Sequence, residues 1–234
     1  MKDLTKGYPA KVIILFAIPM IFGSIFQQLY NIADSKNVST FVGTEAFAAV
    51  GATSVVSNTL IGFLNSLTLG FAIPIANSFG GKDYKRMRRM VAGTVLLTLA
   101  GAVVLTVLIL LLIPAILKLL ATPEDIMNPA LAYVRIILYG IIFVSVYNMC
   151  ANVLRAVGDS RTPLYCLIVS VFVNIGLDLL FVNGFHMGIE GAAWATILSQ
   201  ALSAVLCLGY ILLKFRDIIP VSYTHLRAHE TEAD

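Results

Sequence analysis

Six apolar segments, each long enough to cross a lipid bilayer, follow one another along this chain. A membrane-spanning helix needs about 20 predominantly apolar residues. None of the segments alternates polar and apolar residues, which is the pattern of strands in a membrane β-barrel. We therefore predict an all-α integral membrane protein, a bundle of six transmembrane helices over about 12–37, 46–79, 91–116, 130–153, 164–183 and 189–213.

The composition excludes an ordinary soluble domain. Of the 234 residues, 59% are hydrophobic and 12% charged, whereas soluble domains have about 45–50% apolar and about 25% charged residues. The three cysteines, at positions 150, 166 and 207, all lie inside apolar runs. Their number and spacing fit neither a disulfide framework nor a zinc site. We expect the lipid bilayer as the surroundings, with no nucleic-acid partner and no bound cofactor.

Lysine and arginine residues are concentrated in alternate loops. The N-terminal stretch, residues 82–89, residues 155–161 and the stretch after residue 213 hold most of the 16 basic residues. Because short cytoplasmic loops of membrane proteins are enriched in Lys and Arg, both termini are predicted to be cytoplasmic. The expected location is the plasma (inner) membrane of a prokaryote, crossed several times. Arg135 is expected about one turn into the fourth helix, where its side chain can reach the outer headgroups.

Two carboxylates, Asp34 and Asp178, fall inside predicted spans. A charge within the bilayer is expensive, so such a residue indicates a functional site. The first and fifth helices run in the same direction, which places both carboxylates in the outer half of the membrane, where they can share one cavity. A carboxylate in a medium of low dielectric constant can exchange a proton near neutral pH. Both residues are therefore predicted to couple proton or cation movement.

Neutral polar side chains accompany these carboxylates at helical spacing. Amide and hydroxyl groups there can hydrogen-bond a carboxylate or complete an oxygen shell around sodium. An alternative is that they only join neighbouring helices by hydrogen bonds. The candidates are Gln27 and Tyr30 on the first helix, Asn174 on the fifth, and Thr196 and Gln200 on the sixth.

Several sequence motifs together resemble the multidrug and toxic compound extrusion (MATE) transporters, specifically their N-terminal six-helix lobe. In chain order they are IPMIFGSIFQQLYNIADS, FVGTEAFAAVGATS, FGGKDYKRMRR, AYVRIILYG, LRAVGDSRTP, VNIGLDLLFV and GIEGAAWATILSQ, and the resemblance spans about residues 8–216. It implies a fold of twelve helices in two lobes that rock about a central cavity and expel cationic drugs in exchange for protons or sodium. It places the proton or sodium site on Asp34, Asn174, Asp178 and Thr196, with Gln27 and Tyr30 beside them. Gln27, Tyr30 and Gln200 are expected to line the cavity.

The resemblance also sets the expected domain organisation. Residues 1–216 would form the N-terminal lobe, and the partner would be a missing C-terminal lobe or a second copy of the chain. The stretch from Lys36 to Thr40 departs from the family pattern at the outer end of the first helix. Residues 221–234 are polar, unlike everything before them, and are expected to be a non-native tail without function.

Three other functions were weighed against the half-transporter. A flippase for lipid-linked saccharides, from the same broader superfamily, would need several cationic residues to hold a pyrophosphate headgroup. An enzyme would need a nucleophile with its base, or a metal cluster, inside the spans, and His186 is the sole histidine before the tail. The chain is therefore predicted not to be an enzyme. A non-transporting membrane scaffold remains as the third alternative.

Overall fold

The computed structural model describes residues 8–214, apart from the side chains of a few residues in the first helix; the polar tail at 221–234 lies outside this range. The described chain is helical throughout and contains no strand. The elements are α1 (Pro9–Phe41), α2 (Thr44–Gly80), α3 (Tyr84–Leu119), α4 (Glu124–Ala156), α5 (Arg161–Asp178), the π-helix η1 (Leu179–Gly184) and α6 (Gly188–Lys214).

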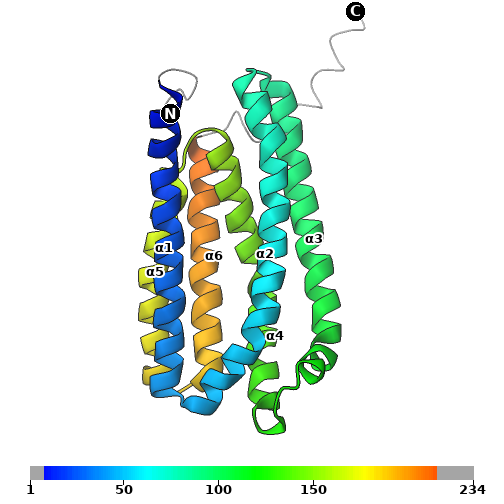
Figure 1. Ribbon diagram of the computed structural model, residues 1–234, viewed down its shortest axis with the longest axis vertical. Coiled ribbons are helices and arrows are strands. Elements are labelled where there is room, and N and C mark those ends of the chain that lie inside the picture. The colour runs from blue at the N-terminus through cyan, green and yellow to red at the C-terminus, as the bar shows by residue number, and fades with distance from the viewer. Residues whose placement is uncertain (1–7, 215–234) are drawn as a thin grey trace, which may run out of the picture.

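The helices run alternately up and down in one bundle, joined by short turns (Figure 1). Each range expected from hydropathy lies inside one helical segment, with η1 continuing α5. Five of the segments are long and apolar enough to cross a membrane, and α1 contains a shorter apolar stretch, Ile13–Leu29. Polar residues from Gln27 onward lower the hydropathy of the rest of α1. The predicted all-α membrane fold is confirmed.

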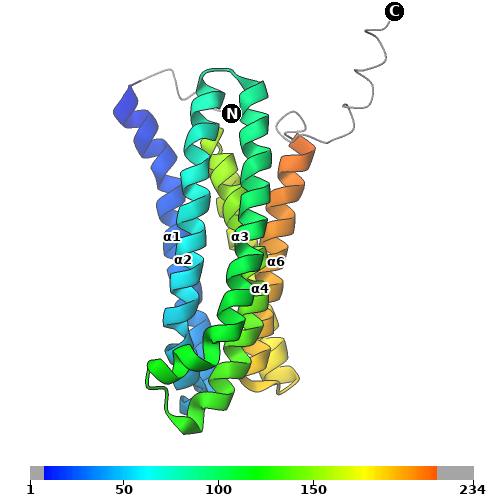
Figure 2. The ribbon, with the colours of Figure 1, turned by 90° about the vertical axis from the view of Figure 1, so that its right-hand side faces the viewer.

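The N-terminal half of the first helix stands away from the rest of the bundle. Figure 2 shows its N-terminal half leaning away from α2 and the other helices. Large apolar side chains along it are exposed, among them Ile13, Ile21 and Phe22 at 66%, 57% and 51%. Further along, α1 packs against α5 and α2. One flank of the lobe is therefore open along α1.

Basic residues gather at the end of the bundle where the α2–α3 and α4–α5 turns meet the start of α1 and the end of α6 (Figure 1). This end carries Lys11, Lys82, Lys85, Arg89 and Arg161, all exposed. The charge segregation expected from the loops is thus present in the folded bundle.

Asp159 ties the α4–α5 turn to the end of α6. Its carboxylate accepts hydrogen bonds from the backbone N–H of Arg161 (3.2 Å) and of Thr162 (3.1 Å) and from the Thr162 hydroxyl (2.8 Å). These bonds satisfy the free N–H groups that open α5. Tyr210 of α6 donates to the same carboxylate at 3.2 Å, and Lys214 donates to the Tyr210 hydroxyl at 2.7 Å. One side chain therefore caps a helix and anchors its neighbour.

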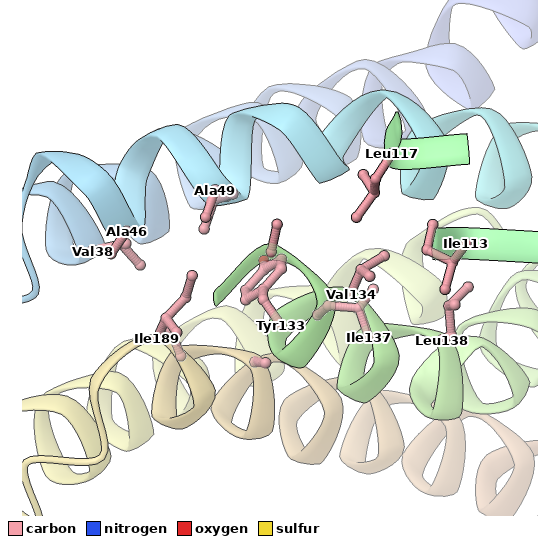
Figure 3. Close-up of a cluster of buried hydrophobic side chains, with 14 of the residues drawn as sticks. Val38, Ala46, Ala49, Ile113, Leu117, Tyr133, Val134, Ile137, Leu138 and Ile189 are labelled. Atoms are coloured by element: carbon pink, nitrogen blue, oxygen red, sulfur yellow. The ribbon is translucent and has the colours of Figure 1, made fainter. Parts of the chain in front are cut away.

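Two apolar clusters hold the bundle. The cluster near the basic end includes Met87, Leu154 and all three cysteines, which are buried free thiols. The other cluster lies toward the opposite end, where Tyr133 of α4 sits between Ala49 of α2 and Ile189 of α6 (Figure 3). Burial of apolar side chains between helices fixes how each helix is rotated, and so decides which polar residues face inward.

Arg135 lies further along the fourth helix than expected. The expectation placed it one turn into the fourth helix, but α4 begins at Glu124, so Arg135 lies about 16 Å from its start at ~1.5 Å per residue. The polar stretch from Glu124 is helical because acidic residues in a first turn interact favourably with the helix dipole. The Arg135 side chain is exposed.

The orientation predicted from the basic loops can be measured by cysteine labelling. Single cysteines replacing Asp83 and Glu124 would lie at opposite ends of the bundle, both at exposed positions. An impermeant thiol reagent added to intact cells is expected to label position 124, on the outer side, and not position 83, on the cytoplasmic side. The three native cysteines are buried and should give little background labelling. Labelling at 83 in unbroken cells would reverse the orientation.

Candidate functional site

A cavity of about 260 Å³ opens between α1, α2, α4 and α6. Its rim includes Gln27, Asn31 and Asn58, which are exposed. The remaining lining residues are Val50, Ser54, Ser57 and Ile61 from α2, Tyr133, Ile137, Gly140 and Val144 from α4, and Thr196, Ile197 and Gln200 from α6.

Helical spacing brings these side chains to one place. Gln27 and Asn31 are one turn apart on α1, and Thr196 and Gln200 are one turn apart on α6. Residues three or four apart share one face of a helix. Helices α1 and α6 thus each present one polar stripe to the same cavity, although the two stripes come from distant parts of the sequence.

The lining combines amide and hydroxyl groups with apolar side chains. Among the side chains that the structure describes around the cavity, none is charged. Such a mixture of polar groups and apolar side chains is typical of sites that bind small organic molecules. The cavity can therefore hold an apolar or aromatic body and form hydrogen bonds to its polar atoms.

Close contact between α4 and α6 forms the floor of the cavity. A Cβ atom placed on Gly140 would lie 2.5 Å from Ile197 Cγ1 and 3.3 Å from Ile197 Cβ. Glycine allows this approach because it has no side chain. Both residues line the cavity, so its shape depends on this contact.

We expect Gly140→Ala to destabilise the chain by about 1–3 kcal/mol, the usual cost of overpacking a core. The added methyl group would displace Ile197 or separate α4 from α6. Thermal unfolding in detergent measures the effect. Gly62→Ala is the matched control, because a Cβ there meets nothing within 4 Å. Equal unfolding temperatures for the two variants would show that the contact is not tight.

Asn174 and Asp178 lie apart from the lining of this cavity. They are one turn apart on α5, and each is only 1% exposed. Neither side-chain atom of Asn174 has a hydrogen-bond partner within the described part of the chain. A buried amide without partners costs about 1–3 kcal/mol, which is unusual in a native core. The pair is thus buried within the bundle, where α5 packs mainly against α6 and α1.

The helix changes its geometry directly after Asp178. Residues Leu179–Gly184 form a π-helix, which is packed against α6. A Cβ on Gly191 of α6 would lie 3.2 Å from Phe181 Cβ, so the two segments approach closely. π-helical turns are rare and frequently lie at functional sites.

The predicted site residues thus fall into three groups. Gln27, Thr196 and Gln200 line the cavity, whereas Asn174 and Asp178 are buried on α5. Tyr30 and Asp34 belong to α1, but their side chains lie outside what the structure describes. The coupling roles of these residues stay predictions.

Sequence reasoning missed the contribution of α2. Ser54 and Asn58 are one turn apart on it, and Ser57 lies beside them on the cavity wall. The signal was present as polar residues at helical spacing inside an apolar span. Carboxylates give the stronger sequence signal for a site inside the membrane, and α2 carries none after its first turn.

The cavity and the buried acid sit in a chain whose sequence and fold match known proteins. The MatE family model matches residues 19–180. The probable multidrug resistance protein YpnP of Bacillus subtilis is 31% identical over 231 residues, 99% of this chain and 52% of that protein. The probable multidrug resistance protein NorM of Thermotoga maritima is 30% identical over 209 residues, 87% of this chain and 44% of that protein.

Solved structures give the same result. A MATE crystal structure in the bent conformation superposes with a TM-score of 0.84 at 29% identity, over 91% of this chain and 47% of that one. A transporter of the MOP superfamily from Pyrococcus furiosus, described as having a binding pocket of reverse polarity, gives 0.84 at 30% identity, over 92% and 47%. The chain spans about half the length of the relatives that it matches. It is a multi-pass membrane protein, and it belongs to the MatE family.

Proposed function

We propose that this chain is the N-terminal lobe of an efflux antiporter that exports cationic organic compounds in exchange for protons or sodium. The observation that carries the proposal is the polar cavity between α1, α2, α4 and α6 beside a helix with a buried carboxylate. The cavity supplies a binding site for an organic molecule, and the carboxylate supplies a group that can exchange a cation.

The two tasks are divided between two places in the lobe. The substrate would rest against Thr196 and Gln200 in the cavity. Protons or sodium would exchange at Asp178, with Asn174 one turn away and Asp34 as a second carboxylate. The amide of Asn174 suits this role, because its oxygen can accept from a protonated acid or contribute to a sodium shell.

The cavity favours export of organic cations over flipping of a lipid-linked saccharide. A site for a pyrophosphate would be expected to present arginine or lysine, and the described lining has neither. Neutral amides and an aromatic ring can bind a cation without an opposite charge, and the lining offers Gln27, Gln200 and Tyr133.

The arrangement requires a second lobe to close the cavity. The matched relatives are about twice as long as the part that this chain covers. That lobe is supplied by a C-terminal half or by a second copy of the chain, with both termini of this lobe in the cytoplasm of a prokaryotic cell.

Export can be tested by joining residues 1–216 to the C-terminal half of YpnP in cells that lack their own drug pumps. Ethidium accumulation is expected to fall, and to recover when a protonophore collapses the gradient or when sodium is replaced by potassium, according to the coupling ion. Full-length YpnP is the positive control. Ethidium accumulation equal to that of empty cells, with the fusion present in the membrane, would favour the scaffold alternative.

A further inference from the structure

The first turns of α3 and the turn before it carry exposed cations that the transport site does not use. The group, which we term the α3 basic face, consists of Lys82, Lys85, Arg86 and Arg89. Arg88 lies at its edge and is also exposed. Their positions along the helix, rather than their number, indicate what they contact.

The α3 basic face points away from the bundle. Buried residues of α3 near this end are Met87, Val91 and Thr94. With ~3.6 residues per turn, Lys85 and Arg89 fall on roughly the opposite side of the helix. Cations there face the surroundings of the protein and not its interior.

The same side of α3 continues as an apolar stripe. Leu96, Val103, Val107 and Leu111 follow Arg89 at intervals of seven or four residues, which keep them on one side of the helix, and are 70%, 50%, 52% and 75% exposed. At ~1.5 Å per residue, Leu96 to Val107 covers about 16 Å, near half of the ~30 Å hydrocarbon core. One stripe thus presents cations at headgroup depth and then a lipid-facing surface about one leaflet deep.

These cations are unfavourable within the protein itself. The N-terminus of a helix carries partial positive charge and favours acidic residues, but the first turn of α3 contains none. The carboxylate of Asp83 is used to cap the helix, accepting from the Arg86 N–H at 2.9 Å. Lys85 and Arg89 are one turn apart, and like charges at this spacing repel. Lys82 also adopts a left-handed φ of +58°, which glycine would adopt with less strain.

We propose that the α3 basic face binds the headgroup of an anionic glycerophospholipid, whose acyl chains lie along the stripe from Leu96 to Val107. A phosphate at this place neutralises the crowded cations and the helix N-terminus together. Clusters of basic residues beside a membrane helix bind anionic lipids by the same attraction. The partner is a lipid and not a free phosphate, because the apolar stripe continues directly from the cations.

Lipid preference of the purified chain tests this proposal without any transport measurement. The purified chain is mixed with equal amounts of phosphatidylglycerol and phosphatidylcholine. The lipids that stay bound are then counted by native mass spectrometry. The wild-type chain is expected to retain phosphatidylglycerol in preference to phosphatidylcholine. Each cation near an anionic surface strengthens binding about fivefold, so Lys85→Gln/Arg89→Gln is expected to lower the preference by about 25-fold.

The matched control removes the same charge elsewhere. Lys118→Gln/Arg135→Gln also neutralises two exposed basic residues and is expected to leave the preference unchanged. An equal loss in both double variants would assign the effect to net charge and overturn the proposal. A wild-type chain that retains the two lipids equally would overturn it as well, even where a variant fails to fold.

Discussion

Asp178→Asn is expected to abolish coupled export by the fusion of this lobe with the C-terminal half of YpnP, reducing ethidium efflux to the level of empty cells. Asparagine keeps the shape of the side chain but neither exchanges a proton nor supplies a formal charge to sodium. Because the residue is only 1% exposed, bulk water cannot replace the missing charge. The measurement is dye efflux after energisation, normalised to the amount of fusion in the membrane.

Asp125→Asn is the matched control for this variant. Asp125 is an exposed acid in the first turn of α4, so the same chemical change there is expected to leave efflux near the wild-type rate. Undiminished efflux by the Asp178 variant would remove this residue from the coupling mechanism. Failure of both variants to reach the membrane would be seen in the normalisation.

The second large effect concerns the lobe by itself. Residues 1–216 are expected to insert as a bundle and then to self-associate in mild detergent. The flank along α1 exposes Gln27 and Asn31, and Asn58 of α2 is exposed beside the cavity. Polar groups moved from water to an apolar medium without hydrogen bonds cost roughly 2–7 kcal/mol each. Light scattering after size-exclusion chromatography is expected to show dimers or larger species. Co-expression with a second lobe is expected to give a single discrete species instead.

Gln27→Leu/Asn31→Leu/Asn58→Leu tests the cause of that association. Leucine has no polar group, so the free-energy cost of exposing unbonded amides to detergent is removed from this flank. The triple variant is therefore expected to shift toward a monomer. A wild-type monomer that exports a cationic dye along an imposed proton gradient would show that one lobe suffices for transport.

The number and order of the helices were predictable because hydropathy acts segment by segment. A span such as 164–183 is apolar enough to be recognised without knowing what it packs against. Helix ends were less predictable, since capping decides them locally. The helix at Glu124 begins in a polar stretch after Pro123, where hydropathy carries no signal.

The grouping of the site residues was harder to predict. Periodicity shows that Asn174 and Asp178 share a face, but not which helices cover that face. Both are buried on α5, which packs mainly against α6 and α1, while the Thr196 stripe of α6 faces the cavity. Rotation of each helix is set by side chains that interlock between helices, such as Gly140 with Ile197, and a single sequence does not reveal those partners.

The π-helix after Asp178 has a consequence for how the chain length can vary. A π-turn takes up one more residue than an α-turn because its hydrogen bonds span five residues instead of four. Deleting one residue within Leu179–Gly184 would let this segment continue as an ordinary α-helix, leaving every residue before it in place. The same deletion between Asn174 and Asp178 would turn one of them by about 100° away from the other. A single-residue deletion is thus expected to be tolerated in η1 and not in α5 between Asn174 and Asp178.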